Sequence, residues 1–176
     1  QDYLTAMCRR TFQAGLSRKV IEKKWPTLKK AFFNFNSKRC AFINDDEIAA
    51  YMNNPDVIRH LGRVKAVRAN ASMIEWVNQQ QGSFAEMIAN WPVTDIVGLW
   101  RFLQKQGSYL GGRSAAMILR SVGKDTFIIT DDMLKEIKEK TANGDKFLPT
   151  YPVVIIDEQG EIVAKANKTL YIRRKQ

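Results

Sequence analysis

Apolar residues recur at helical intervals along most of the chain, and this pattern predicts a mostly helical protein. Over residues 2–14, Leu4, Met7, Cys8 and Phe12 fall near one helical face, and Gly15 ends the segment. The same spacing predicts helices over residues 17–24, 26–33, 45–52, 56–81, 83–90, 94–106 and 114–122, with a break in the longest one at Gly62.

Polar residues mark where two of the helices begin. Asn44, followed three residues later by Glu47, predicts a capping box. Thr130 predicts the N-cap of a further helix, and Asp131 and Asp132 stand in its first turn, where negative charge is electrostatically favoured. The sequence therefore predicts two carboxylates at the start of one helix.

The last part of the chain follows a different pattern. Residues 151–157 and 161–166 predict two strands, and the turn between them contains Gln159 and Gly160. An isolated hairpin is only marginally stable, so we expect it to pack on the helices. The predicted fold is mostly α with a small C-terminal β-hairpin. We expect a helical domain over residues 1–145 and a hairpin appendage over 146–176, packed on the same domain.

Composition and charge narrow the class of partner. The chain has 176 residues with 45% hydrophobic side chains, as in an ordinary globular protein, and carries a formal net charge of +10. That excess of Lys and Arg favours a polyanion, most commonly nucleic acid. Cys8, Cys40 and His60 are too few for a zinc or iron–sulfur site, so no metal or other cofactor is expected. The sequence has no signal-peptide or membrane-spanning pattern, and a cytoplasmic location is expected.

A glycine turn stands before the helix over residues 114–122. Gly111 and Gly112 lack a Cβ, so backbone amides there can come very close to a ligand. The helix that follows directs its unpaired amides and its positive dipole end to the same place, which suits a phosphate group. Arg113 and Ser114 belong to this turn. The basic residues Arg120 and Lys124 are expected to assist the phosphate contact.

The order of these elements resembles the helix-hairpin-helix DNA glycosylases, with the motif at about residues 96–123. In that superfamily the hairpin amides hold a DNA phosphate, and an aspartate about eighteen residues further on stabilises positive charge on the sugar. Asp132 lies eighteen residues after Ser114 and is the matching candidate, with Asp131 as the fallback.

Two further blocks are similar to the 3-methyladenine DNA glycosylase I family. They are FQAGLS, at residues 12–17, and VIRHLGRVKA, at residues 57–66. Together with the glycine turn, the resemblance covers roughly residues 2–134. It implies a base pocket or wedge at the first block, with the candidates Arg10, Gln13, Gly15, Leu16, Ser17 and Arg18. Leu16 is the candidate for the apolar wedge that fills the vacated base stack.

The sequence also departs from that family at the residues expected to read the base. Arg10 stands where the family has a glutamate, and Arg18 stands where a tryptophan is usual. A guanidinium only donates hydrogen bonds, so it cannot replace a carboxylate that accepts them. The family's zinc ligands at its two ends also have no counterpart here. The base-recognition chemistry is therefore expected to be absent or altered.

The resemblance implies a monofunctional DNA glycosylase that removes an alkylated or modified, 3-methyladenine-like base from duplex DNA in base excision repair. Bifunctional relatives carry a lysine just after the hairpin. This chain has Ser114 or Ala115 there, so no lyase activity is expected. The expected partner is double-stranded DNA containing damaged bases, bound by a monomer. The alternative is a non-catalytic or altered-specificity relative that recognises DNA structure, which the two arginines favour, whereas Asp132 favours the enzyme.

Overall fold

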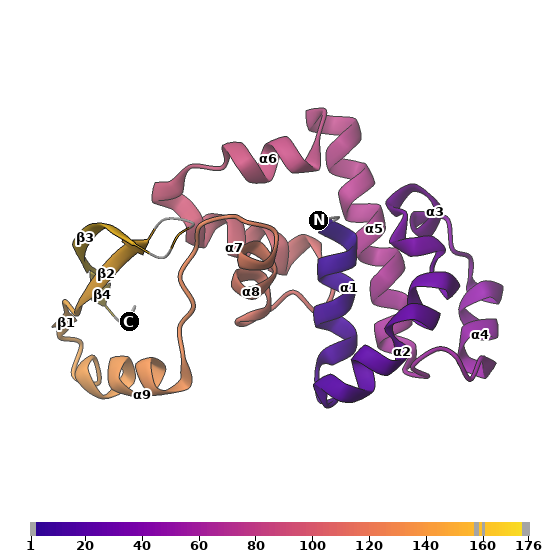
Figure 1. Cartoon of the computed structure of the whole chain (residues 1–176), viewed down its shortest axis with the longest axis horizontal. Coiled ribbons are helices and arrows are strands. Elements are labelled where there is room, and N and C mark those ends of the chain that lie inside the picture. Colours follow the sequence, from indigo (N-terminus) through magenta and orange to yellow (C-terminus); the bar gives the residue numbers. More distant parts are fainter. Residues whose placement is uncertain (1–2, 157–158, 160, 174–176) are drawn as a thin grey trace. The chain divides into compact units, whose positions relative to one another are not determined.

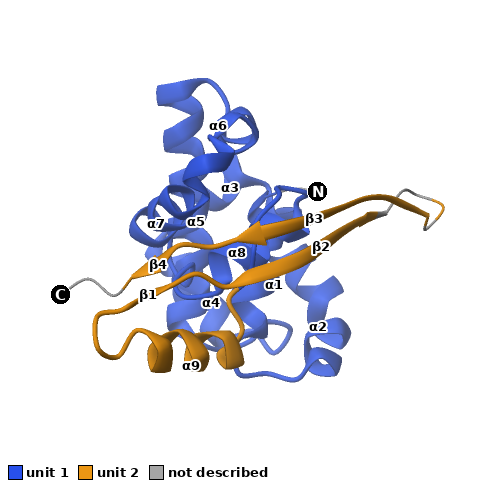
Figure 2. Cartoon of the chain, turned by 90° about the vertical axis from the view of Figure 1, so that its left-hand side faces the viewer, with its two compact units in different colours: residues 1–128 blue, residues 129–176 orange. Residues whose placement is uncertain are grey.

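The computed structural model describes residues 3–156, 159 and 161–173, and the chain divides into two compact units after Ile128 (Figures 1 and 2). The helices of the first unit are α1 (Tyr3–Gln13), α2 (Arg18–Ala31), α3 (Ser37–Ala41), α4 (Asp45–Asn53), α5 (Leu61–Gln81), α6 (Phe84–Asn90), α7 (Ile96–Gln106) and α8 (Ser114–Ser121), with short 3-10 turns at Phe33–Phe35 and Val93–Asp95. The second unit contains α9 (Asp131–Lys140) and the strands β1 (Lys146–Phe147), β2 (Thr150–Ile156), β3 (Ile162–Thr169) and β4 (Ile172–Arg173). The predicted mostly α fold with a small C-terminal hairpin is confirmed.

The first unit is built around α5. This helix packs against α1, α3, α4 and α6, while α1 also contacts α2 and α8 (Figure 1). The apolar residues predicted for the inner face of α1, namely Leu4, Met7, Cys8 and Phe12, are all buried. Burying a side chain of this size contributes roughly 1.5–3 kcal/mol to folding. The core therefore fixes α1, which carries several of the candidate pocket residues.

Two predicted helix boundaries are wrong. The predicted segments 17–24 and 26–33 form one continuous helix, α2, which runs through Pro26. Proline has no N–H to donate, so the carbonyl of Glu22 loses its helical donor. Both residues are exposed, which lets water take the place of that donor.

The other wrong boundary concerns the start of α5. The segment before residue 61 is a loop, whose backbone carbonyls at Pro55 and Asp56 accept hydrogen bonds from Lys24 and Thr27. Gly62 does not break the helix but lies in its first turn. A Cβ there would come 2.6 Å from the hydroxyl oxygen of Tyr109, so glycine permits a close approach.

An unpredicted left-handed turn follows α2. Phe33, Asn34 and Phe35 have φ values of 51°, 54° and 57°, a region that costs L-residues other than glycine roughly 1–2 kcal/mol each. Packing compensates for this cost. The rings of Phe32 and Phe35 are stacked with their centroids 5.9 Å apart, and the guanidinium of Arg39 lies 4.4 Å from the centroid of the Phe33 ring.

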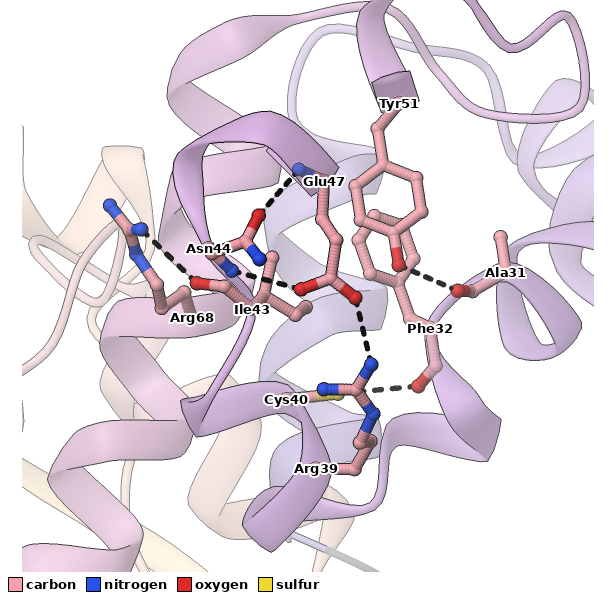
Figure 3. Close-up of polar contacts among 9 residues, drawn as sticks. All are labelled: Ala31, Phe32, Arg39, Cys40, Ile43, Asn44, Glu47, Tyr51 and Arg68. Carbon is pink, nitrogen blue, oxygen red and sulfur yellow. Dashed lines mark hydrogen bonds and ion pairs between the residues drawn. The ribbon is translucent and has the colours of Figure 1, made fainter. Parts of the chain in front are cut away.

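Polar contacts hold α3 and α4 beside this turn (Figure 3). The hydroxyl of Tyr51 donates to the carbonyl of Ala31 at 2.9 Å. Burial is the main cause that raises the pKa of Tyr51, with a smaller contribution from Glu47, so the hydroxyl stays protonated as a donor. The predicted capping box at α4 is confirmed. The amide of Glu47 donates to Oδ1 of Asn44 at 2.8 Å, and the Glu47 carboxylate accepts from the Asn44 amide at 3.0 Å.

Replacing Asn44 by alanine is expected to lower the free energy of unfolding by about 1 kcal/mol, because it removes the Oδ1 that accepts from the amide of Glu47. Chemical denaturation followed by circular dichroism measures the change. Asn53→Ala at the other end of α4 is the matched control, since its exposed side-chain amide donates a long hydrogen bond, at 3.4 Å, to the carbonyl of Ala49. Equal losses in the two variants would contradict the role assigned to the box.

The second unit contains α9 and two antiparallel strand pairs. Strand β2 pairs with β3 from Thr150↔Thr169 to Ile156↔Ile162, and β1 pairs with β4. The strand predicted over residues 161–166 runs further, to Thr169. Asp157 and the predicted turn residue Gly160 lie outside the described residues.

The division between the units falls after Ile128, earlier than the predicted boundary at residue 145. Helix α9 therefore groups with the strands (Figure 2). Packing of the hairpin on the helical domain stays a prediction. Among the described residues, no helix is both long and apolar enough to span a membrane.

Candidate functional site

The glycine turn joins α7 to α8. Gly112 has φ +57°, the left-handed conformation that favours glycine. Gly111 does not adopt this conformation. The other positive φ in this turn belongs to Tyr109. Gly111, Gly112 and Arg113 are exposed. The amide of Ser114 donates to the Gly111 carbonyl at 3.1 Å, so the turn is closed by its own backbone. The phosphate contact predicted for this turn stays a prediction.

The segment before the glycines is anchored to α5, which the sequence reasoning missed. Asn70 is fully buried; its Oδ1 accepts from the amide of Ser108 at 2.7 Å, and its Nδ2 donates to the Ser108 carbonyl at 3.0 Å. Leu110 is buried two residues later. The signal for this role in the sequence was the polar residue Asn70 among apolar positions of the helix. Asn70 thus holds the turn that presents Gly111 and Gly112.

The two basic residues predicted to assist the turn lie elsewhere. Arg120 is exposed in the last turn of α8, about 9 Å along the helix axis from Ser114 at the usual rise per residue. The ammonium of Lys124 donates to the carbonyls of Ala89 and Trp91, at 2.9 and 3.0 Å. Lys124 therefore ties down the C-terminal end of α6. Contact with a phosphate would require it to exchange two hydrogen bonds.

A hollow of about 160 Å³ opens between α1 and α8; we call it the α1–α8 hollow. Its lining from α1 is Ala6, Arg9, Arg10 and Gln13, and its lining from α8 is Met117, Ile118 and Ser121. A second hollow of about 380 Å³ shares Arg9, Gln13 and Ser121 with the first and adds Arg18, Ile21 and Glu22 from α2. The two hollows are thus adjacent. The second hollow lies within the size range of small-molecule sites.

Three of the residues predicted for the base pocket line these hollows. Arg10 and Gln13 are half-buried on α1, and Arg18 is exposed at the start of α2. The Nε of Arg18 donates to the carboxylate of Glu22 at 2.6 Å, and this hydrogen bond raises the pKa of Arg18. Both side chains are exposed, so their pairing adds little to stability.

The other three predicted pocket residues form the link between α1 and α2. Gly15 has φ +71°, Leu16 is half-buried against the core, and the Ser17 hydroxyl accepts from the amide of Val20 at 3.4 Å as the N-cap of α2. Arg63 supports this link, a role that the sequence reasoning missed. Its guanidinium donates to the carbonyls of Phe12, at 3.3 Å, and Ala14, satisfying groups left over at the end of α1.

The two candidate carboxylates open α9 in the second unit. Thr130 is the N-cap, as predicted, and its hydroxyl accepts from the amide of Met133 at 3.2 Å. Asp131 and Asp132 are both exposed in the first turn. The structure therefore confirms the predicted cap. The catalytic role of either carboxylate stays a prediction.

Neither cysteine lines the two described hollows. Cys8 and Cys40 are both buried, neither forms a disulfide within the described part of the chain, and the thiol of Cys40 contacts the carbonyl oxygen of Phe32 at 3.2 Å. Across residues 3–156, 159 and 161–173, no group of three metal-ligating side chains gathers.

The chain is similar to known proteins over most of its length. A family model for methyladenine glycosylases matches residues 1–106. The DNA-3-methyladenine glycosylase of Haemophilus influenzae is 25% identical over 161 residues, which cover 81% of this chain and 84% of that protein.

Solved structures share the fold. A mutant 3-methyladenine DNA glycosylase I from Staphylococcus aureus superposes with a TM-score of 0.60 at 21% identity, covering 69% of this chain and 75% of the other. A 3-methyladenine DNA glycosylase I in complex with 3-methyladenine gives a TM-score of 0.59 at 20% identity, covering 72% and 78% of the two chains.

Proposed function

Because the chain belongs to the methyladenine glycosylase family, we propose that it is a monofunctional DNA glycosylase acting on an alkylated or otherwise modified base in duplex DNA. The reaction is hydrolysis of the N-glycosidic bond, the first step of base excision repair. We further propose that the protein acts as a monomer, in the cytoplasm, on double-stranded DNA that contains damaged bases. The relative from Haemophilus influenzae, a DNA-3-methyladenine glycosylase, supports a 3-methyladenine-like substrate.

The α1–α8 hollow is the observation that carries this proposal. Most of its lining comes from α1, inside the segment that the family model matches. It contains Arg10 and Gln13, which the sequence predicted for the base pocket. An enzyme that acts on a base must take it out of the stack into such a pocket, at a cost of a few kcal/mol that is smaller for damaged pairs.

The glycine turn supplies the proposed grip on the DNA backbone. The backbone amides of the exposed residues Gly111, Gly112 and Arg113, at the positive end of the α8 dipole, are suited to a phosphate near the damaged base. The net charge of +10 adds attraction to the polyanion. Leu16 is the proposed wedge, and Ser17, as the cap of α2, fixes the backbone beside it.

Asp132 is the proposed catalytic carboxylate, with Asp131 as the fallback. Its spacing from the glycine turn in the sequence and its exposed place in the first turn of α9 support this role. As the base departs, positive charge develops at the anomeric carbon. A carboxylate stabilises that charge or orients the attacking water, and the effect grows as water is excluded from the site.

An alternative function is recognition of DNA structure without excision. Arg10 and Arg18 favour this alternative. Both stand at positions where the 3-methyladenine DNA glycosylase I family has residues that contact the base. Under this alternative, the chain binds damaged or distorted DNA and releases no base. Salt-dependent binding does not separate the two functions, because every basic DNA-binding protein shows it.

Formation of abasic sites tests the proposed function. Methylated duplex DNA incubated with the protein is expected to break at abasic sites after alkali treatment but to stay intact without it. Ser114 and Ala115 offer no amine for a Schiff base, so borohydride is expected to trap no protein–DNA adduct. A rapidly accumulating adduct would contradict a monofunctional enzyme, and DNA that resists alkali would favour the alternative.

A further inference from the structure

The charged side chains around the two hollows differ in whether another side chain already engages them. Glu22, the only carboxylate that lines either described hollow, is already bonded to Arg18 at 2.6 Å. The guanidinium of Arg9 lies over the ring of Trp25, 5.3 Å from its centroid. Arg10 differs from both. Among the described residues it has no hydrogen-bond or ion-pair partner, although it is half-buried in the lining.

The remaining polar groups complement this free cation. Ser121 donates its hydroxyl proton to the carbonyl of Ile118 at 2.7 Å, so its oxygen keeps only acceptor capacity toward the hollow. Gln13 offers an amide oxygen that accepts and an amide nitrogen that donates. The hollow thus combines a strong, unpaired donor at Arg10 with neutral acceptors at Gln13 and Ser121.

Purine bases differ in what they present to such groups. A guanine-type base carries an exocyclic carbonyl, O6, beside the acceptor N7, and arginine can donate to both at once. Its ring N–H suits a neutral acceptor. An adenine-type base carries an amino group at the same position, which would place a donor against a guanidinium that only donates. The charge pattern therefore discriminates between the two kinds of base.

We propose that the α1–α8 hollow selects an alkylated base with an exocyclic carbonyl, of the guanine type, and that Arg10 determines this specificity by donating to the carbonyl oxygen. The inference rests on the proposed glycosylase function and names the class of base that the site takes. Ala6, Met117 and Ile118 supply apolar contact for the ring. Unlike the substrate named for the relatives, 3-methyladenine, this base has no amino group at position 6.

The test compares two bases that carry the same methyl group, 3-methylguanine and 3-methyladenine. Binding of each free base is measured by calorimetry, and release of each from methylated duplex DNA is measured at enzyme excess. We expect the wild-type protein to favour 3-methylguanine at least about tenfold in binding, the scale of a well-formed bidentate contact to a base. Arg10→Glu is expected to reverse the preference, because a carboxylate accepts from the adenine amino group.

The matched control is Lys30→Glu, which makes the same change in net charge on an exposed position of α2 outside the hollows. It is expected to keep the wild-type preference, and thermal melts show whether both variants fold. Equal affinity for the two bases, a preference for 3-methyladenine, no binding of either base, or an Arg10→Glu variant with the wild-type preference would overturn the inference. A preference for 3-methylguanine in binding without release of any base would support the assigned specificity and contradict the proposed function. Release of bases with 3-methyladenine preferred would support the proposed function and contradict the assigned specificity.

Discussion

Asp132→Asn is expected to slow release of the base from methylated duplex DNA at least about a hundredfold, which corresponds to about 2.7 kcal/mol of transition-state stabilisation. The substitution keeps the shape of the side chain and removes its charge, so it removes the stabilisation of positive charge on the sugar. Rate constants are measured in a single turnover at enzyme excess, which separates the chemical step from product release.

Asp131→Asn is the matched control for this experiment. Both carboxylates stand in the first turn of α9, so each substitution loses a similar interaction with the helix dipole, about 0.3–1 kcal/mol. We expect Asp131→Asn to retain most of the rate. A large loss in Asp131→Asn alone would move the catalytic role to the fallback residue. Wild-type rates in both variants would exclude a catalytic carboxylate in this turn.

Asn70→Ala is expected to lower the free energy of unfolding by about 3 kcal/mol. The substitution leaves the amide and the carbonyl of Ser108 without their buried partner, and each unsatisfied group costs about 1–3 kcal/mol. Because these two bonds hold the segment that leads into Gly111 and Gly112, we also expect weaker binding to duplex DNA. Denaturation gives the stability, hydrogen exchange at the Ser108 amide reports on the turn, and a DNA titration gives the affinity.

Ile74→Ala provides the comparison, since it truncates another buried residue of α5 and costs about 2–5 kcal/mol without removing a bond to the turn. The two variants should lose similar stability, but only Asn70→Ala should speed exchange at Ser108 and weaken DNA binding. Slow exchange at Ser108 in Asn70→Ala would show that the turn does not depend on this side chain.

Helix ends were the most predictable part of the fold. The capping box of Asn44 with Glu47 and the N-cap at Thr130 depend on side chains that bond to amides two or three residues away, so the local sequence determines them. The C-terminal hairpin was predictable for the same reason, because runs rich in β-branched residues and a turn signal lie close together in the chain.

Features that depend on distant packing were not predictable. The left-handed turn at Phe33–Phe35 runs against local preference, and it exists because buried aromatic rings outweigh the backbone cost. Lys124 follows a glycine in a loop, which suggests a free cation, yet its partners are carbonyls more than thirty residues earlier in the chain. Of the family-like block over residues 12–17, Gln13 alone lines the two described hollows, beside Arg10 and Arg18, which flank the block. The block did not reveal that Arg63 and Asn70 hold the backbone around the two candidate contact regions.

Release of a free modified base from methylated duplex DNA tests the central claim most directly. The duplex is incubated with excess protein, and bases that leave the DNA are separated and identified by chromatography against a protein-free sample. The proposed function predicts that a methylated purine appears in solution in a single exponential phase while the DNA strands stay intact. Tight binding of the same duplex with no base released above the protein-free sample would contradict it.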